Sequence, residues 1–352
     1  MMTSAPKVTW TKVTPAPDPT HGSPIPRSSH GLSIVQNGTR LILLGGEHVA
    51  RTPIDVSNSH WAADLMDDGK WQWRLLSPAA TGPTDRIAHA QAVHKDSFVY
   101  IFGGRAGITM QEKAMSDLWK LDVSAAPGTE TWSQVEATNE GPEARSFHRM
   151  ICIGDFLYMF GGCTPTGREN DLWRFDVLAK KWENLGRSAL LRGRGGPNLV
   201  PLASGSLMGV VAGFAGEETA DGHAFHIANK KWENSGLELE GMRPRSVCVA
   251  ASFPSVGKSI VFGGEVDPSD RGHMGAGGFE NDIVILDEAT GKYETTIAGG
   301  TSSDWPATRG WSDASSCDNG KGLGQVFVFG GLSGDDKNPT RLDDLWILQV
   351  EK

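Results

Sequence analysis

Basic charge is scarce in this 352-residue sequence, because 33 Lys and Arg residues face 42 Asp and Glu residues and leave a net charge of −9. No segment concentrates Lys and Arg, and proteins that bind nucleic acids or anionic membrane surfaces need such clusters to neutralise phosphate groups. We therefore exclude nucleic acid and the membrane surface as main partners.

Long apolar runs and paired cysteines are also missing. No stretch approaches the roughly 18 consecutive apolar residues that a membrane-spanning helix requires. The N-terminus lacks the basic and then apolar pattern of a secretory signal, so we expect a cytoplasmic protein. Single cysteines without Cys-x-x-Cys spacing are expected to be packed thiols and not a zinc site or a disulfide framework. These cysteines are Cys152, Cys163, Cys248 and Cys317.

Glycine, proline and tryptophan are plentiful by comparison. The 44 Gly and 19 Pro residues are typical of many tight turns between short strands. Apolar residues make up 39% of the chain, which is enough for an ordinary core and argues against disorder. Twelve Trp against three Tyr is the unusual feature, and an internal repeat accounts for it.

A short apolar run that ends in Gly-Gly recurs along the chain. The five clear copies are LILLGG, VYIFGG, LYMFGG, IVFGG and VFVFGG, which end at Gly46, Gly104, Gly162, Gly264 and Gly331. A degenerate copy, GVVAGFAG, is aligned with Gly213 as its first glycine and Phe214 at the second glycine position. The spacings between copies are 58, 58, 52, 50 and 67 residues, near the kelch repeat period of about 50.

Each copy carries the same flanking signals. An Arg-x-x-His segment or a variant of it precedes the Gly-Gly pair, beginning at Arg27, Arg86, Arg145, Arg194, Arg245 and Arg309. An acidic and apolar strand follows the pair, beginning at Asp64, Asp117, Asp171, Asp282 and Asp344. A last strand carries an aromatic residue, and we expect nearly all of the repeated tryptophans to pack between neighbouring repeats, which buries large apolar areas.

The sixth copy ends without its last strand, whereas Val8 to Val13 has the pattern of a last strand with nothing before it. We therefore predict an all-β, six-bladed kelch β-propeller that its N-terminal strand closes, which removes an open sheet edge. The whole chain, residues 1–352, forms one domain in this prediction. The expected blades span residues 25–75, 84–135, 143–185, 192–236, 243–296 and 307–350, with the closing strand at 7–14.

The topology of such a blade brings two sets of residues to one mouth of the channel, because adjacent antiparallel strands run in opposite directions. One set follows the Gly-Gly pairs and includes Glu47, Arg105, Cys163 and Glu265; the other precedes the first strands and includes His30, His89, Arg145, His148, Arg309 and Trp311. Loops on a rigid scaffold often carry function. The alternative is that the repeated Arg and His residues join loops of neighbouring blades.

The loop after the fifth Gly-Gly pair is the sharpest functional candidate. It places three carboxylates and a histidine, those of Glu265, Asp267, Asp270 and His273, within nine residues. Carboxylate and imidazole ligands with open positions are typical of non-haem iron sites. The same groups equally suit a general acid and base pair. A solvated acidic loop with a turn at Pro268 is the third interpretation.

Several motifs together resemble the plant kelch proteins of glucosinolate breakdown, the nitrile-specifier, epithiospecifier and thiocyanate-forming proteins, which have similar kelch proteins in fungi. The motifs are RSSHG at 27–31, FGGR at 102–105, GPEARSFH at 141–148, GGEV with a following GHxGxG at 263–277, RGW at 309–311 and RLDDL at 341–345. The resemblance implies an iron(II)-dependent lyase with Glu265 and His273 as ligands. The middle ligand position is Ser269 here, and Asp270 or Asp267 is the candidate replacement. It further implies that Arg105 contacts substrate and that Trp311 and Phe214 form an aromatic wall.

Two function hypotheses follow. The first is a small-molecule lyase or isomerase that rearranges, eliminates or cyclises a reactive intermediate, as in secondary metabolism, either with Fe(II) or with no cofactor. Its candidate catalytic residues are Glu265, Asp270, His273, Arg105 and Trp311, and its candidate substrate-binding residues are Glu47, Arg145, His148, Phe214 and Arg309. The second is a non-catalytic kelch module for protein interaction. The resemblance also suggests a homodimer.

Overall fold

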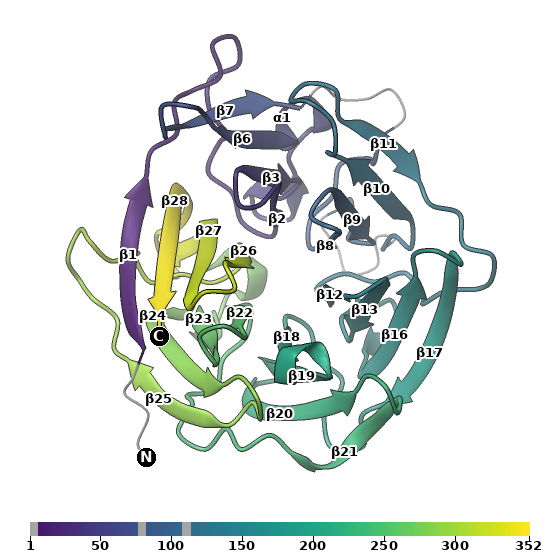
Figure 1. Cartoon of the computed structure of the whole chain (residues 1–352). Coiled ribbons are helices and arrows are strands. Elements are labelled where there is room, and N and C mark those ends of the chain that lie inside the picture. Colours follow the sequence, from purple (N-terminus) through teal and green to yellow (C-terminus); the bar gives the residue numbers. More distant parts are fainter. Residues whose placement is uncertain (1–5, 77–81, 108–113) are drawn as a thin grey trace.

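Six four-stranded antiparallel sheets surround a central channel, and this confirms the predicted six-bladed propeller (Figure 1). The structure is a computed structural model that describes residues 6–76, 82–107 and 114–352. In every blade one strand lies next to the channel and the fourth lies at the periphery. Apolar clusters fill the spaces between adjacent blades, so each blade is stabilised by its two neighbours.

The first three blades follow one another along the chain. Blade 1 contains β2 (Gly31–Val35), β3 (Arg40–Leu44), β6 (Trp61–Leu65) and β7 (Trp71–Leu75). Blade 2 contains β8 (Ala90–His94), β9 (Phe98–Phe102), β10 (Leu118–Asp122) and β11 (Thr131–Gln134). Blade 3 contains β12 (Arg149–Ile153), β13 (Phe156–Phe160), β16 (Asp171–Asp176) and β17 (Lys181–Arg187).

The other three blades complete the ring. Blade 4 contains β18 (Asn198–Leu202), β19 (Leu207–Phe214), β20 (Glu218–His226) and β21 (Lys231–Gly236). Blade 5 contains β22 (Val249–Phe253), β23 (Lys258–Asp267), β24 (Gly278–Asp287) and β25 (Tyr293–Ile297). Blade 6 contains β26 (Asp313–Asp318), β27 (Leu323–Gly334), β28 (Pro339–Glu351) and β1 (Lys7–Val13).

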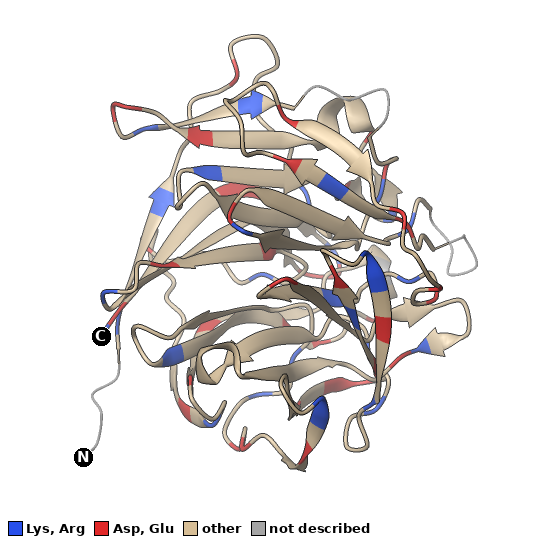
Figure 2. Ribbon diagram, turned by 45° about the vertical axis from the view of Figure 1, so that its right-hand side comes forward, with Lys and Arg blue, Asp and Glu red and all other residues tan. Residues whose placement is uncertain are grey.

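Short elements decorate the connections. They are β4 (Glu47–Val49), β5 (Thr52–Pro53), α1 (Val56–Ser59), β14 (Cys163–Thr164), β15 (Gly167–Arg168) and the 3-10 turns η1 (Ala203–Gly205) and η2 (Gly272–Met274). Within the described ranges no helix is long and apolar enough to cross a membrane. Basic and acidic side chains are interspersed over the blades (Figure 2).

The N-terminal strand closes the propeller as predicted. Strand β1 pairs antiparallel with β28, with Lys7 opposite Glu351 and Val13 opposite Leu345. The Trp10 side chain is buried in the apolar cluster between blades 5 and 6, and its ring centroid lies 4.8 Å from that of Phe262. The first and last residues of the repeat array thus share one sheet, and the sixth blade has no missing strand.

One buried arginine in each blade forms a hydrogen bond with the glycine turn of that blade. Each guanidinium donates at 2.9–3.0 Å to a backbone carbonyl, and the pairs are Arg27 with Gly45, Arg86 with Gly103, Arg145 with Gly161, Arg194 with Ala212, Arg245 with Gly263 and Arg309 with Gly330. Five of these arginines also pair with a carboxylate, namely that of Asp117, Asp171, Asp221, Asp282 or Asp344. These guanidinium contacts are structural, but they lie within each blade and do not join the loops of neighbouring blades as the alternative interpretation expected.

Two alignments made from the sequence were wrong by a few residues. In blade 4, the turn has Ala212 (φ 61°) and Gly213 (φ 117°) where other blades have Gly-Gly, so Phe214 is the residue after the pair. In blade 1, Ser59 and not Asp64 stands opposite the buried arginine, since the Ser59 carbonyl accepts from Arg27 at 2.7 Å. Arg27 lacks a carboxylate partner in this position, and burial lowers its pKa to about 9.

A closed ring of backbone hydrogen bonds encircles the channel. Its members are the third residues of the six Arg-x-x-x segments, all with φ between 45° and 58°: Ser29, Ala88, Phe147, Gly196, Val247 and Trp311. Each N–H donates to the carbonyl of the ring residue in the preceding blade at 2.8–3.1 Å, and Ser29 accepts from Ala88 and donates to Trp311. Every side chain at this position therefore projects from a fixed backbone, whichever residue stands there.

Loss of one buried arginine is expected to destabilise the whole propeller. Arg245→Ala leaves the carboxylate of Asp282 buried without its partner, so we expect the free energy of unfolding to fall by about 3–5 kcal/mol in urea titrations. The matched control is Arg192→Ala, which removes an ion pair between exposed side chains and should cost less than about 1 kcal/mol. Equal losses in the two variants would contradict the structural role of the buried arginine.

Candidate functional site

Six short backbone contacts build the mouth of the channel that the sequence predicts. In each blade the residue after the buried arginine pairs with the residue after the glycine turn, as in Ser28 with Glu47 and Ser246 with Glu265. The residues after the turn are Glu47, Arg105, Cys163, Phe214, Glu265 and Leu332. The two sets therefore converge at one mouth, and the side chains that differ between blades meet there.

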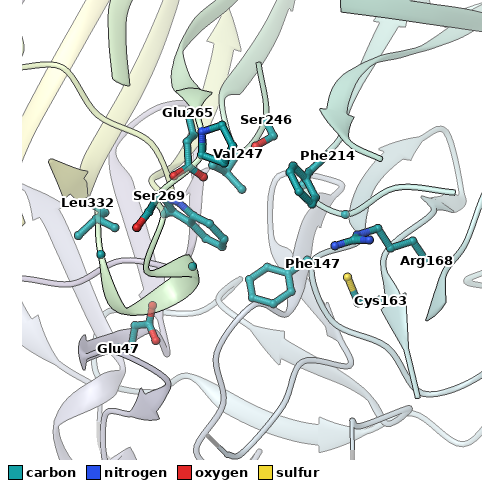
Figure 3. A pocket seen from close by; sticks show the side chains of 16 residues that line it. Glu47, Phe147, Cys163, Arg168, Phe214, Ser246, Val247, Glu265, Ser269 and Leu332 are labelled. Atoms are coloured by element: carbon teal, nitrogen blue, oxygen red, sulfur yellow. The ribbon is translucent and has the colours of Figure 1, made fainter. Parts of the chain in front are cut away.

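A pocket of about 290 Å³ opens at this mouth (Figure 3). Ring residues Phe147, Val247 and Trp311 line it together with the blade 5 loop from Pro268 to Gly275. The rings of Phe147 and Trp311 meet edge to face with centroids 5.4 Å apart, although they come from blades 3 and 6. This contact forms an aromatic floor across the channel.

An ion pair also spans the channel, below the aromatic floor. Arg149 on β12 and Asp313 on β26 form an ion pair of 2.6 Å, and Asp313 also accepts from the backbone N–H of Leu32 at 2.8 Å. A small cavity of about 50 Å³ lies at this level and has both ring aromatics and Arg149 in its wall. The mouth pocket is thus separated from the channel space of about 220 Å³ that the inner strands line.

Glu265 supplies the most perturbed carboxyl group of the pocket. It ends the buried part of β23, and its side chain is 8% exposed. Burial and the nearby charge of Glu218 raise its pKa to about 7, against the opposing effect of N–H groups of Gly277, Ser269 and Trp311. A carboxyl group with this pKa exchanges protons near neutral pH, as a general acid or base must.

Glu47 is the second carboxylate in the wall, and hydrogen bonds already satisfy it. It accepts from the hydroxyls of Ser28 and Ser29 at 3.2 and 3.1 Å and from the backbone N–H of Arg51, and it lies 3.5 Å from the Arg341 guanidinium. The predicted substrate-binding residue Glu47 thus lines the pocket, and its carboxylate oxygens already have protein hydrogen-bond partners.

Arg168 provides positive charge on the opposite side of the pocket. It lies on β15, across from Cys163 on β14, and its guanidinium stacks over the Phe214 ring at 4.7 Å. Among the described residues it has no ion-pair partner within 4.0 Å. Arg168 was missed from the sequence because it stands six residues beyond the Gly-Gly pair, where the repeat has no defined position. Phe214, which was predicted, lines the same wall.

Arg105, predicted as a substrate and catalytic residue, lies behind the aromatic floor. Its side chain is buried, donates to the Ser146 hydroxyl from Nε and Nη2 at 3.0 and 2.7 Å, and lies 5.2 Å from the centre of the Phe147 ring. The residues that line the pocket do not include it. Arg105 therefore supports the Phe147 ring from behind.

Three other predicted residues also lie outside the pocket wall. Arg145 and Arg309 are fully buried, where each binds a glycine carbonyl and an aspartate of its own blade. His148 is 5% exposed, its ring meets the Phe102 ring edge to face, and burial holds its pKa well below the ordinary value. The two arginines thus stabilise their own blades, and His148 packs against a residue of the neighbouring blade.

The acidic loop disperses its charged groups. The Asp267 carboxylate pairs with Arg243 at 3.0 Å and is largely exposed, and Asp270 is exposed as well. The Ser269 hydroxyl donates to the Asp336 carboxylate. His273 lies in η2, and its side chain is outside the described part of the structure. Across the described residues, which do not include the His273 side chain, no three His, Cys, Asp or Glu side chains gather closely enough to hold a metal ion.

The cysteines agree with the sequence prediction. All four are free thiols, and burial raises the pKa of each. Cys163 lines the pocket beside Arg168.

Comparisons with known proteins match this architecture. A model of the KLHDC2/KLHL20/DRC7 kelch-repeats domain matches residues 31–264. An N-(sulfonatooxy)prop-2-enimidothioate sulfolyase of Thlaspi arvense is 28% identical over 335 residues, which are 88% of this chain and 89% of that protein. Human host cell factor 2 is 31% identical over 174 residues, which are 46% of this chain but only 20% of that protein.

A solved structure described as YjhT superposes with a TM-score of 0.66 at 16% identity and covers 92% of this chain and 95% of its own. At this identity the likeness concerns the fold alone.

The dispersed acidic loop leads to a prediction for iron. We expect the purified protein to bind no stoichiometric Fe(II) under anaerobic conditions, because the described carboxylates around Glu265 do not converge on one point. Equilibrium dialysis followed by metal analysis measures this. One Fe(II) per chain, lost in Glu265→Gln, would show that the loop rearranges around a metal.

Proposed function

The chain belongs to the KLHDC2/KLHL20/DRC7 kelch-repeats domain family, and from that premise we propose that it is an enzyme of lyase or isomerase type that acts on a small anionic molecule in the mouth pocket. The pocket itself carries the proposal. A buried carboxyl group, Glu265, and a stacked guanidinium, Arg168, line one cavity whose floor is aromatic. Proton transfer and charge stabilisation are the two tasks that such a pair performs.

The sulfolyase relative supports this class of reaction, since the alignment covers nearly all of both chains. Its name describes a substrate with a sulfonatooxy group, which is an anion and a leaving group on one small molecule. For the present chain we propose a substrate of the same general kind, a compact molecule with an anionic leaving group and an apolar body. The pocket volume of about 290 Å³ suits a ligand of this size.

Each pocket residue has a role in this proposal. Arg168 compensates the negative charge that grows on the leaving group while its bond breaks with the electron pair. Glu265 transfers a proton to or from the substrate. The rings of Phe147 and Trp311 hold the apolar body and exclude water from the cavity, which protects a reactive intermediate from hydrolysis.

A protein-interaction module is the second candidate. The matched part makes up a fifth of host cell factor 2, so a similar kelch segment also occurs as one part of a longer protein. Kinetic measurements on the pocket variants distinguish the two functions, since an interaction module would show no turnover that depends on Glu265.

Glu265→Gln is expected to reduce kcat by about 10²–10⁴-fold with little change in KM, because the amide retains the shape but cannot transfer the proton. The assay follows product formation from N-(sulfonatooxy)prop-2-enimidothioate and related sulfonatooxy compounds. Unchanged turnover in this variant would reject the catalytic role of Glu265.

Arg168→Met should act mainly on binding. The methionine keeps a flexible chain over Phe214 but removes the charge, so we expect KM for an anionic substrate to rise by about tenfold or more. Arg192→Ala is the matched control, because this arginine is exposed and pairs with Glu217 away from the pocket wall. A similar KM in wild type and Arg168→Met would contradict an anionic ligand.

A further inference from the structure

Two loops from neighbouring blades meet beside the pocket. The first, residues 268–277, joins β23 to β24 in blade 5, and the second, residues 335–338, joins β27 to β28 in blade 6. The blade 6 hairpin is long, with strands of 12 and 13 residues, and its tip is shaped by Gly334 at φ 91° and by Asp335. The Asp335 carboxylate accepts from the N–H groups of Lys337 and Asn338 at 2.8 Å. This turn places Asp336 over the blade 5 loop.

Asp336 binds three consecutive residues of that loop. Its carboxylate accepts from the Ser269 hydroxyl and, at 3.2 Å, from the backbone N–H of Asp270. Its backbone carbonyl accepts from Nη1 of Arg271 at 2.5 Å. Within the loop, the Ser269 oxygen also accepts from the Arg271 N–H at 3.0 Å. Hydrogen bonds to a carboxylate are stronger than those between neutral groups, so this cluster ties the two loops firmly.

The same loop surrounds the Glu265 carboxyl group. Hydrogen bonds from the backbone N–H groups of Gly277 and Ser269 to the Glu265 carboxyl group oppose the rise of its pKa. A Cβ on Gly277 would lie 1.9 Å from the backbone carbonyl oxygen of Asp267 and 2.8 Å from Oε1 of Glu265, so glycine is required at this position. A Cβ on Gly275 would lie 2.1 Å from Oδ1 of Asp336 and would disturb that carboxylate. A shift of the loop would move its N–H groups away from Glu265.

We propose that Asp336 is a positioning residue that latches the 268–277 loop onto blade 6 and so holds two N–H donors against the Glu265 carboxyl group. In the resemblance to specifier proteins, residue 269 stands where a metal ligand is expected. Here the Ser269 hydroxyl donates a hydrogen bond to the Asp336 carboxylate, and this carboxylate organises the loop. The latch concerns the loop itself, and only the kinetic measurement below rests on the proposed function.

Hydrogen exchange of the intact chain tests the latch. In Asp336→Ala we expect amide exchange within residues 268–277 to rise by roughly tenfold, the size of one lost hydrogen bond to a charged group. Asp336→Asn should restore part of the protection, because the amide oxygen still accepts from Ser269. Asp343→Asn is the control, since it removes the same charge from an exposed position on β28. Equal exchange in wild type and Asp336→Ala would overturn the proposal.

Two further measurements separate the latch from its alternatives. Fe(II) added anaerobically should leave the exchange of residues 268–277 unchanged in wild type. If Fe(II) instead protects the loop equally in wild type and Asp336→Ala, a metal and not Asp336 organises it, and the proposal is wrong. If wild type turns over a sulfonatooxy substrate, Asp336→Ala should lower kcat and Asp336→Asn should recover part of it. Absence of turnover in wild type would reject the proposed function, while the exchange result would still decide the latch.

Discussion

The ring of six backbone hydrogen bonds around the channel is the constraint on which this structure depends. Each member must adopt a left-handed backbone conformation, which costs free energy for any residue other than glycine. Five of the six members are not glycine, so the surrounding contacts compensate that cost in five blades. The buried arginines supply part of the compensation, because each holds its glycine turn beside the ring through a carbonyl and, in five blades, an aspartate.

This arrangement separates the scaffold from the site. The backbone at the ring and at the residues after the glycine turns is nearly the same in each blade, whereas the side chains there differ. Three ring positions carry the large residues Phe147, Val247 and Trp311, and two of these meet across the channel. The pocket thus arises largely from variable side chains on one repeated frame, namely five of the residues after the turns and three of the ring residues, and its shape follows from which blade carries which residue.

Charged side chains are distributed unevenly around that pocket, and this distribution determines which chemical steps the pocket can support. Glu47 accepts hydrogen bonds from two serine hydroxyls and lies 3.5 Å from the Arg341 guanidinium, whereas Glu265 is buried beside Glu218, and burial raises its pKa. Arg168 stacks on Phe214 at the opposite wall. The pocket therefore has a buried carboxyl group at one side and a guanidinium at the other, with the aromatic floor between them.

The sequence by itself determined the propeller, its six blades and its closure by the N-terminal strand, because glycine turns, buried arginines and apolar strands recur at a regular spacing. It also placed the two sets of variable residues at one mouth of the channel, since strand direction follows from antiparallel pairing. It misplaced the blade 4 turn by one residue, because Ala212 adopts a conformation normally taken by glycine. Only the tertiary structure decided which candidates face the pocket. Arg145, Arg309 and Arg105 satisfy their polar groups inside the scaffold, and the buried His148 ring packs against Phe102. Arg168 and Asp336 reach the pocket and its loop from connections whose direction no repeat specifies. Contacts between blades 3 and 6 and between the loops of blades 5 and 6 join residues far apart in the chain, so local sequence patterns contain no signal for them.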